Sequence, residues 1–372
     1  MIPYRSRRRF LVESAACAGA LALGARASAN APRQSPKADE LAGKAVAFLK
    51  DHQSADGSWS VDRKEPGLTA LVVTALLRSR RVTPNEPVIV KGLAFLERYV
   101  GVGQDPTDVP HANYTTAIAL LAFKEANAAG KYDALIQQGR AFLTKAQWDE
   151  SEGKGPGDPF YGGAGYGGRN SRPDMSNTSV FLEALRDTGL PADDPAVKRA
   201  LVFISRCQNL KSEFNDQPYA GKINDGGFIY STNNGGESFA GKTDDGGLRS
   251  YAGMTYAGLK SMIYAGLTPD DPRVKAALSY IKEHYTLDEN PGLGQQGLFY
   301  YYQVFAKALG QLGRPKITDA KGVEHDWRAE LVEALARRQN PDGSWVNKAD
   351  RFMEGDPNLV TGYGLLALAY AR

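Results

Sequence analysis

The sequence predicts an all-α fold, an (α/α)6 toroid in which six helix pairs form two concentric rings. Two observations lead to this prediction. Six amphipathic segments recur along the chain, each with Lys, Arg and Glu on one face and Ala, Val, Leu and Phe on the other. A second helix, rich in Ala, Leu, Thr, Tyr and Gly and poor in charge, follows each of them, as expected of a helix buried on both sides. An internal repeat of this length is typical of one large domain.

The amphipathic segments are expected to form the outer ring, and the helices poor in charge the inner ring. The outer helices are predicted over residues 39–52, 86–99, 132–147, 194–207, 271–284 and 326–338. The inner helices are predicted over residues 67–80, 113–127, 175–188, 249–265, 297–312 and 358–371. Residues that cap helices, such as Asp174 and Asn358, stand where several inner helices are expected to begin. Residues 39–372 therefore form a single toroid domain.

The first 29 residues have the pattern of an export signal. A basic head with Arg7, Arg8 and Arg9 precedes a weakly apolar stretch, and residues 27–29 give an A-x-A cleavage site. The pattern is that of a twin-arginine signal, so we expect a periplasmic or extracellular protein. Cys17 leaves a lipoprotein anchor as an alternative, and residues 30–38 are expected to be a linker. No other stretch approaches the ~20 apolar residues of a membrane span.

Charge and cysteine usage exclude several classes of protein. Five arginines and one glutamate lie in the leader, and without them 40 basic and 41 acidic residues remain. The composition therefore predicts no nucleic-acid partner. Only Cys207 remains after the leader, which leaves no disulfide and no cysteine cluster for a metal. No phosphate loop or dinucleotide fingerprint is present, so we expect no cofactor and no metal.

The connections of such a toroid predict where a site lies. All links from an outer to the next inner helix meet at one end of the ring. Two of them, residues 148–174 and 208–248, are long and rich in glycine, aromatic residues and aspartate. Long loops on a rigid scaffold are common places for function. We therefore expect the site on this rim, over the mouth of the central cavity.

A repeated turn gives the sequence a family resemblance. Gln53 with Asp56-Gly-Ser-Trp59 recurs as Gln339 with Asp342-Gly-Ser-Trp345. This pattern resembles the QW repeat of squalene-hopene cyclases and, more broadly, the prenyltransferase and squalene-cyclase superfamily, which implies an α/α toroid. The sharp motif covers the first and last units, and the six-fold pattern covers nearly all of the chain after the leader. The residue types favour a structural role: Gln bonds the backbone of a neighbouring helix and Trp packs between repeats.

The characteristic chemistries of this superfamily lack their motifs here. The resemblance to the cyclases implies a D-x-D-D motif that protonates an alkene, and the sequence has none. The resemblance to the prenyltransferases implies zinc held by an Asp and a nearby Cys. Asp174 stands at the position of that Asp, but the position of the Cys is occupied by Ser176. We therefore expect neither the known cyclisation mechanism nor zinc dependence, and whether the protein is an enzyme stays open.

Candidate site residues come from the rim and from the inner helices. Asp174, Asp225 and Asp245 are the candidate catalytic acids or bases, with helix capping or a turn as the alternative role. Aromatic rings and arginines that could bind a substrate are Tyr166, Arg172, Arg249, Tyr251, Tyr256, Phe299, Tyr301 and Tyr363. Three consecutive tyrosines, residues 300–302, cover more than half a helix turn, so at least one must face the centre.

These features predict an exported, terpenoid cyclase-like toroid that binds or transforms an isoprenoid-type apolar ligand in an aromatic-lined cavity. Two alternatives stay open. One is a polysaccharide-active glycosidase or lyase, since sugar rings also stack on tyrosine. The other is a non-catalytic scaffold. A deep tunnel would favour the isoprenoid, an open acidic groove the glycan, and a filled centre the scaffold.

Overall fold

The computed structural model describes residues 35–60, 65–100, 109, 111–167 and 171–371. The predicted signal peptide, residues 1–29, lies outside the described residues. The described part beyond residue 34 forms one compact unit, and its helices follow the predicted pattern closely.

Twelve α-helices lie in the described residues, and they alternate between two kinds. The helices with an exposed charged face are α1 (Pro36–Asp51), α3 (Pro87–Glu97), α5 (Asp133–Lys145), α7 (Pro195–Arg206), α9 (Pro272–Glu283) and α11 (Trp327–Ala336). The more fully buried helices are α2 (Pro66–Arg78), α4 (Ala112–Ala126), α6 (Met175–Asp187), α8 (Ala252–Tyr264), α10 (Leu298–Leu312) and α12 (Pro357–Tyr370). In α2, for example, every residue before Arg78 is buried.

Local sequence signals set many of the helix starts. Asp194 and Asp271 cap α7 and α9, and a proline occupies the first turn of each, where its missing N–H costs nothing. Ser35 caps α1 in the same way, because its Oγ accepts a hydrogen bond from the backbone N of Ala38. Helix α1 therefore begins at Pro36, and residues 36–38 belong to its first turn rather than to the predicted linker.

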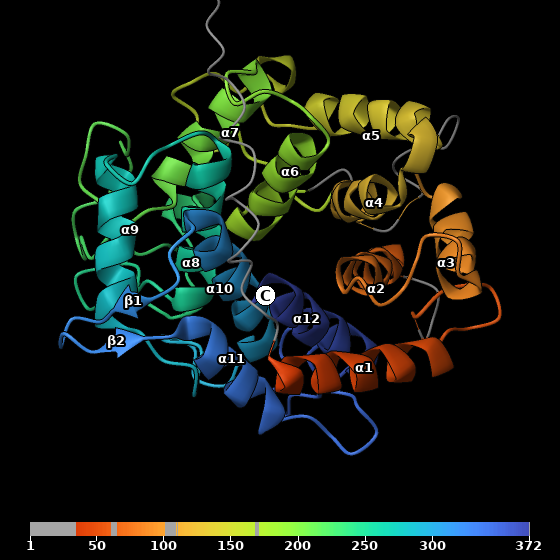
Figure 1. Ribbon diagram of the computed structural model, residues 1–372. Coiled ribbons are helices and arrows are strands. Elements are labelled where there is room, and N and C mark those ends of the chain that lie inside the picture. The colour runs from red at the N-terminus through yellow and green to blue at the C-terminus, as the bar shows by residue number, and fades with distance from the viewer. Residues whose placement is uncertain (1–34, 61–64, 101–108, 110, 168–170, 372) are drawn as a thin grey trace, which may run out of the picture. The chain divides into compact units, whose positions relative to one another are not determined.

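The buried helices form a closed ring. Contacts run from α2 to α4, α6, α8, α10 and α12 in turn, and α12 packs back against α2. The other six helices surround this ring, as Figure 1 shows, and α1 contacts both α11 and α12. The N-terminal and C-terminal parts of the domain thus meet and close both rings. The predicted all-α, two-ring (α/α)6 toroid is confirmed.

Four glutamines join the outer helices through equivalent hydrogen bonds. Each Nε2 donates to the backbone of a later turn and to a carbonyl near the start of another outer helix. The pairs are Gln53 with Val88 (2.8 Å), Gln147 with Ala196 (3.0 Å), Gln208 with Arg273 (2.8 Å) and Gln339 with Leu41 (3.0 Å). The bond from Gln339 reaches α1 and so joins the last unit to the first.

The connections between the helices contain short strands and single turns of 3-10 helix. Strands β1 (Ile317–Thr318) and β2 (Glu324–His325) form an antiparallel hairpin between α10 and α11, which the helical repeat does not predict. Single turns of 3-10 helix lie at Ala128–Gly130, Glu150–Glu152 and Asn233–Gly235.

None of the described helices combines the length and the apolar character needed to cross a membrane.

Candidate ligand-binding site

A pocket of about 420 Å³ lies at the N-terminal ends of the six inner helices. Each inner helix contributes a residue from its first two turns or its N-cap, and the other described lining residues come from the connections before α6, α8, α10 and α12. This is the end of the ring where the connections led us to expect a site. The lining residues are Glu65, Leu68, His111, Tyr114, Tyr166, Ser176, Tyr230, Phe239, Tyr251, Met254, Asn290, Leu293, Gly297, Tyr300, Arg351, Phe352, Met353, Leu359 and Tyr363.

Aromatic and aliphatic side chains make up most of the pocket wall. Tyr300 and Tyr363, from α10 and α12, meet edge to face with ring centroids 6.0 Å apart. Tyr114 from α4 lies 5.7 Å from the ring of Tyr166, which comes from the connection before α6. Burial raises the pKa of Tyr166 to about 12, so this phenol stays neutral at physiological pH. A wall of neutral rings and aliphatic groups favours an apolar ligand.

Asp174 lies directly behind this wall as the N-cap of α6, and it is only 3% exposed. Its Oδ1 accepts a hydrogen bond from the backbone N of Asn177 (2.8 Å), and its Oδ2 accepts one from the Asn177 side chain (2.7 Å). The side chain of Tyr230, which lines the pocket, is also hydrogen-bonded to this carboxyl. Burial raises the pKa of Asp174 to about 6, although these hydrogen bonds oppose the shift.

Among the described residues, three ionisable side chains line the pocket besides its tyrosines. Glu65 Oε2 and His111 Nδ1 lie 3.0 Å apart, within hydrogen-bonding distance. Arg351 comes from the connection between α11 and α12, and its guanidinium lies over the rings of Phe239 and Phe352. Asn290 also lines the pocket, but its amide is already bonded to the backbone of Gly253 and Gln296.

The other two predicted catalytic acids do not line the pocket, and each stabilises a turn. Asp225 accepts hydrogen bonds from the backbone N of Gly227 (2.9 Å) and from Ser250 Oγ (2.7 Å). Asp245 is exposed and accepts from Thr243 Oγ1 and from the backbone N of Gly247. These hydrogen bonds correspond to the turn-stabilising role that we considered as the alternative to catalysis for these two aspartates.

The predicted substrate-binding residues divide into three groups. Tyr166, Tyr251 and Tyr363 line the pocket. Arg172 and Arg249 are exposed residues that do not line it, and Arg172 pairs with Glu237 at 3.7 Å. The remaining rings are buried in the packing around α8 and α10, where Tyr256 contacts Tyr301 and Phe299 contacts Tyr302. These last rings, Tyr256, Phe299 and Tyr301, are core residues rather than pocket residues.

Several pocket residues were not among the predicted site residues. Of the three consecutive tyrosines it is Tyr300 that faces the pocket, while Tyr301 and Tyr302 donate hydrogen bonds to the carbonyls of Thr286 and Leu287. Tyr114, like Tyr300, lies in the first turn of an inner helix, and this position was the signal available in the sequence. Arg351 and Phe352 lie in a connection whose sequence gave no such signal.

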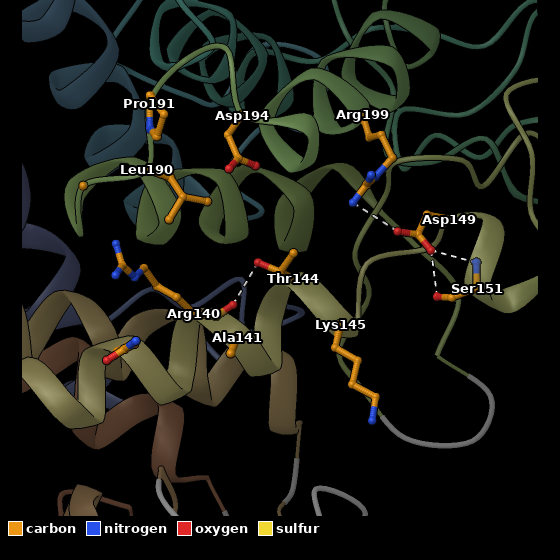
Figure 2. Close-up of a pocket in the computed structure, with 12 residues that line it drawn as sticks. Arg140, Ala141, Thr144, Lys145, Asp149, Ser151, Leu190, Pro191, Asp194 and Arg199 are labelled. Carbon is orange, nitrogen blue, oxygen red and sulfur yellow. Dashed lines mark hydrogen bonds and ion pairs between the residues drawn. The ribbon is translucent and has the colours of Figure 1, made fainter.

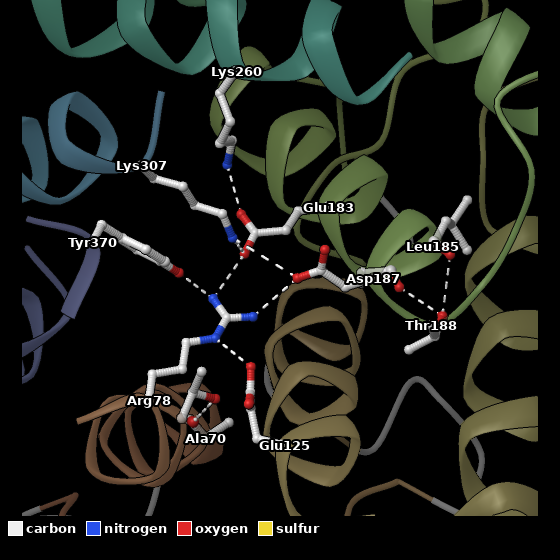
Figure 3. Close-up of polar contacts among 12 residues, drawn as sticks. Ala70, Arg78, Glu125, Glu183, Leu185, Asp187, Thr188, Lys260, Lys307 and Tyr370 are labelled. Atoms are coloured by element: carbon white, nitrogen blue, oxygen red, sulfur yellow. Dashed lines mark hydrogen bonds and ion pairs between the residues drawn. The ribbon is translucent and has the colours of Figure 1, made fainter. Parts of the chain in front are cut away.

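The opposite end of the inner ring is closed by a buried network of charges (Figure 3). Arg78 of α2 binds Glu125 of α4 at 2.7 Å and Asp187 of α6 at 2.9 Å. Glu183 of α6 accepts hydrogen bonds from Lys260 of α8 at 2.8 Å and from Lys307 of α10. Burial alone would raise the pKa of Glu183, but these lysines and Arg78 hold it well below its usual value. Tyr370 of α12 hydrogen-bonds with Arg78, so all six inner helices take part.

A second pocket, of about 640 Å³, lies outside the inner ring between α5 and α7 (Figure 2). Four of the five charged side chains that line it among the described residues, all except Lys145, already have partners within the protein. Arg199 pairs with Asp149 at 3.1 Å, Arg140 donates to the carbonyl of Thr188, and Asp194 caps α7. Because these groups are satisfied, the pocket at the ring mouth is the better candidate site.

Among the described residues, no group of three or more His, Cys, Asp or Glu side chains is placed to hold a metal ion. Cys207 is a free, buried thiol at the end of α7. The structure therefore gives no reason to assign a metal to the pocket.

Comparison with known proteins identifies the fold. No protein-family model and no curated protein sequence matches the chain. Among solved structures, the type II terpene cyclase MstE from Scytonema, in complex with its substrate geranylgeranyl dihydroxybenzoate, is similar with a TM-score of 0.54 and 14% identity. The match covers 90% of this chain and 97% of the cyclase. A protein from Salmonella enterica described as a possible member of the GH105 family is similar with a TM-score of 0.53 and 10% identity, over 90% and 93% of the two chains. The chain thus has a terpenoid cyclase-like α/α toroid fold.

Proposed function

We propose that this protein binds an isoprenoid-type apolar ligand in the pocket at the mouth of the inner ring, and that it does so after export. The observation that carries the proposal is the composition of the pocket wall, where tyrosine and aliphatic side chains from the inner helices surround about 420 Å³. This volume lies within the range of small-molecule sites. Three of the aliphatic groups, Leu68, Met254 and Leu359, come from the first two turns of inner helices. Leu293 and Met353 come from the connections before α10 and α12.

The chemistry of Asp174 favours binding over cyclisation started by a proton. Protonation of an alkene needs a carboxylic acid that is unusually acidic, and burial makes Asp174 a weaker acid than usual. A glycosidase would need two carboxyl groups facing each other across the mouth. Among the described residues that line the pocket, Glu65 is the sole carboxylate, and its Oε2 lies 3.0 Å from His111 Nδ1. Both considerations support a binding site for an apolar molecule.

Ser176 offers a direct test. This small residue lines the pocket from the first turn of α6, and Ser176→Phe would fill part of the cavity with a ring. We expect the wild-type protein to bind farnesol, as followed by isothermal titration calorimetry, and Ser176→Phe to weaken this binding at least 10-fold. Ser176→Ala is the control: it removes the hydroxyl but adds no volume, and it should stay within 3-fold of the wild type.

Two results would contradict the proposal. Equal binding of farnesol by Ser176→Phe and by the wild type would place the ligand outside this pocket. Binding of an oligosaccharide but not of farnesol would favour the polysaccharide-active alternative. Circular dichroism melting curves of both variants check that the fold is retained.

A further inference from the structure

Arg351 is a cation at the mouth of a pocket whose wall is mostly aromatic and aliphatic. Its Nη1 donates a hydrogen bond to Gln296 Oε1 at 3.1 Å, and its guanidinium carbon lies 4.9 Å and 5.4 Å from the ring centroids of Phe239 and Phe352. Within the part of the chain that the structure describes, it forms no ion pair with a carboxylate. Because rings and an amide do not neutralise its charge, the guanidinium can accept an anion from outside the protein.

The loop that carries Arg351 is fixed to the inner ring. Glu354, which is fully buried, accepts hydrogen bonds from the backbone N of Phe299 (2.9 Å) and of Tyr300 (2.8 Å) in the first turn of α10. Its other oxygen accepts from Asn347 Nδ2 at 2.6 Å, at the start of the same loop. The carboxylate therefore ties the loop to α10, and this holds the exposed Arg351 at the mouth of the pocket, which it lines.

A second polar group in the pocket wall lacks a partner. Tyr251 lines the pocket as the N-cap of α8 and is 3% exposed, and its hydroxyl makes no hydrogen bond with the described residues. Its ring lies 6.4 Å from that of Phe239, which also lies under the guanidinium of Arg351. A buried hydroxyl without a partner costs free energy. Because the hydroxyl oxygen is itself buried, a ligand oxygen would reach it after a small movement of the ring and would then remove that cost.

We infer that the ligand of this pocket is an amphiphile with an anionic head group, which Arg351 binds and the Tyr251 hydroxyl contacts as a second donor. The inference rests on the proposed function and narrows its substrate class. The apolar chain lies among Tyr300, Leu359 and Tyr363, and the head group lies at the mouth. Glu65 also lines the pocket, and its carboxylate contacts His111 Nδ1 at 3.0 Å rather than Arg351.

The test compares farnesoic acid with its methyl ester, which has the same chain but no charge. We expect the wild-type protein to bind the acid at least 10-fold more tightly than the ester at pH 7.5 and low salt. In Arg351→Gln this ratio should fall to within 2-fold. Tyr251→Phe, which keeps the ring and removes the hydroxyl, should reduce the ratio by a smaller factor.

The ratio separates loss of charge recognition from general damage to the pocket, since damage weakens both ligands alike. Arg337→Gln is the matched control, because Arg337 is an exposed arginine at the end of α11 that pairs with Asp288, away from the pocket lining. It should leave the ratio unchanged. Equal affinity of the wild type for acid and ester, or an unchanged ratio in Arg351→Gln, would overturn the inference and leave the proposed function standing. Binding of neither ligand would overturn both.

Discussion

At the scale of a single residue, the raised pKa of Asp174 predicts that the stability of the protein depends on pH. Its folded-state pKa is about 6, against 3.8 for an ordinary aspartate, so the folded protein holds this proton over a range in which the unfolded chain has released it. The associated stability is fully present below about pH 4 and is lost as the pH rises to about 6. This difference in the pKa of Asp174 between the folded and unfolded states corresponds to at most about 3 kcal/mol.

Asp174→Asn isolates this effect, since asparagine also caps helices well but does not titrate. We expect the free energy of unfolding of the wild type, relative to that of Asp174→Asn, to decrease between pH 4 and pH 6 in urea titrations. Asp245→Asn is the control: hydrogen bonds from Thr243 and Gly247 lower the pKa of exposed Asp245, so the free energy of unfolding of the wild type relative to that of Asp245→Asn should not decrease between pH 4 and pH 6. If the free energy of unfolding of the wild type relative to that of Asp174→Asn also failed to decrease, the Asp174 carboxyl would be hydrated in the folded protein.

Residue types and spacing predicted part of the candidate site. Tyr166, Tyr251 and Tyr363 were chosen as aromatic residues of the rim or inner helices, and they do line the pocket. The same reasoning also selected Tyr256 and Tyr301, which are core residues, because a sequence does not tell which side of an inner helix faces the centre and which packs on a neighbour. That distinction depends on the rotation of each helix in the ring.

At the scale of the element, the repeated turns explain why glycine recurs in them. Gly57 and Gly343 hold equivalent places and have φ of +92° and +91°. A Cβ on Gly343 would lie 2.5 Å from the carbonyl O of Lys44 in α1, just as one on Gly57 would lie 2.4 Å from that of Lys91 in α3. Each turn thus needs glycine for its backbone conformation and also for its close approach to an outer helix.

Gly343→Ala should therefore cost more than backbone strain alone. The left-handed conformation costs about 1–2 kcal/mol for a residue with a Cβ, and displacement of α1 adds to it. Gly322→Ala is the matched control, because Gly322 has φ of +84° but no atom within 4 Å of the added Cβ. We expect Gly343→Ala to lower the free energy of unfolding by at least about 1 kcal/mol more than Gly322→Ala in urea titrations. Equal losses would mean that α1 is free to move.

Helix limits were predictable because capping residues and prolines mark them in the sequence. Helices α7 and α9 begin one residue after their predicted starts, directly behind Asp194 and Asp271. The connections were less predictable. The loop before α12 carries Arg351 and is fixed by Glu354, and neither residue belongs to a pattern that recurs in the other units. Hydrogen bonds to a distant helix determine where such a loop lies.

At the scale of the whole molecule, the six-fold repeat predicted the ring but not the charges that close one end of it. Arg78, Glu183, Lys260 and Lys307 stand in four different helices, where each looks like an isolated charge in an apolar segment. Only the closed ring, with its inner helices running in the same direction, brings their C-terminal ends together. The pocket at the other end follows from the same arrangement, because the N-terminal turns of the same helices meet there.

The charge network predicts a large effect of one carboxylate on the stability of the whole ring. Glu183→Gln keeps the size of the side chain but leaves the buried ammonium groups of Lys260 and Lys307 without their shared carboxylate. Loss of one partner from a buried ion pair costs about 3–5 kcal/mol, and we expect a decrease of this size in the free energy of unfolding at pH 7. Glu125→Gln is the control, since Glu125 is partly exposed and Arg78 keeps Asp187, so it should cost about 1 kcal/mol or less.

Because the pKa of Glu183 is lowered in the folded state, its stabilisation is present above the ordinary glutamate pKa and is lost as the pH falls. The difference in the free energy of unfolding between the wild type and Glu183→Gln, measured by urea titration, should therefore become smaller at acidic pH. A Glu183→Gln protein as stable as Glu125→Gln would show that helix packing alone holds this end of the ring together.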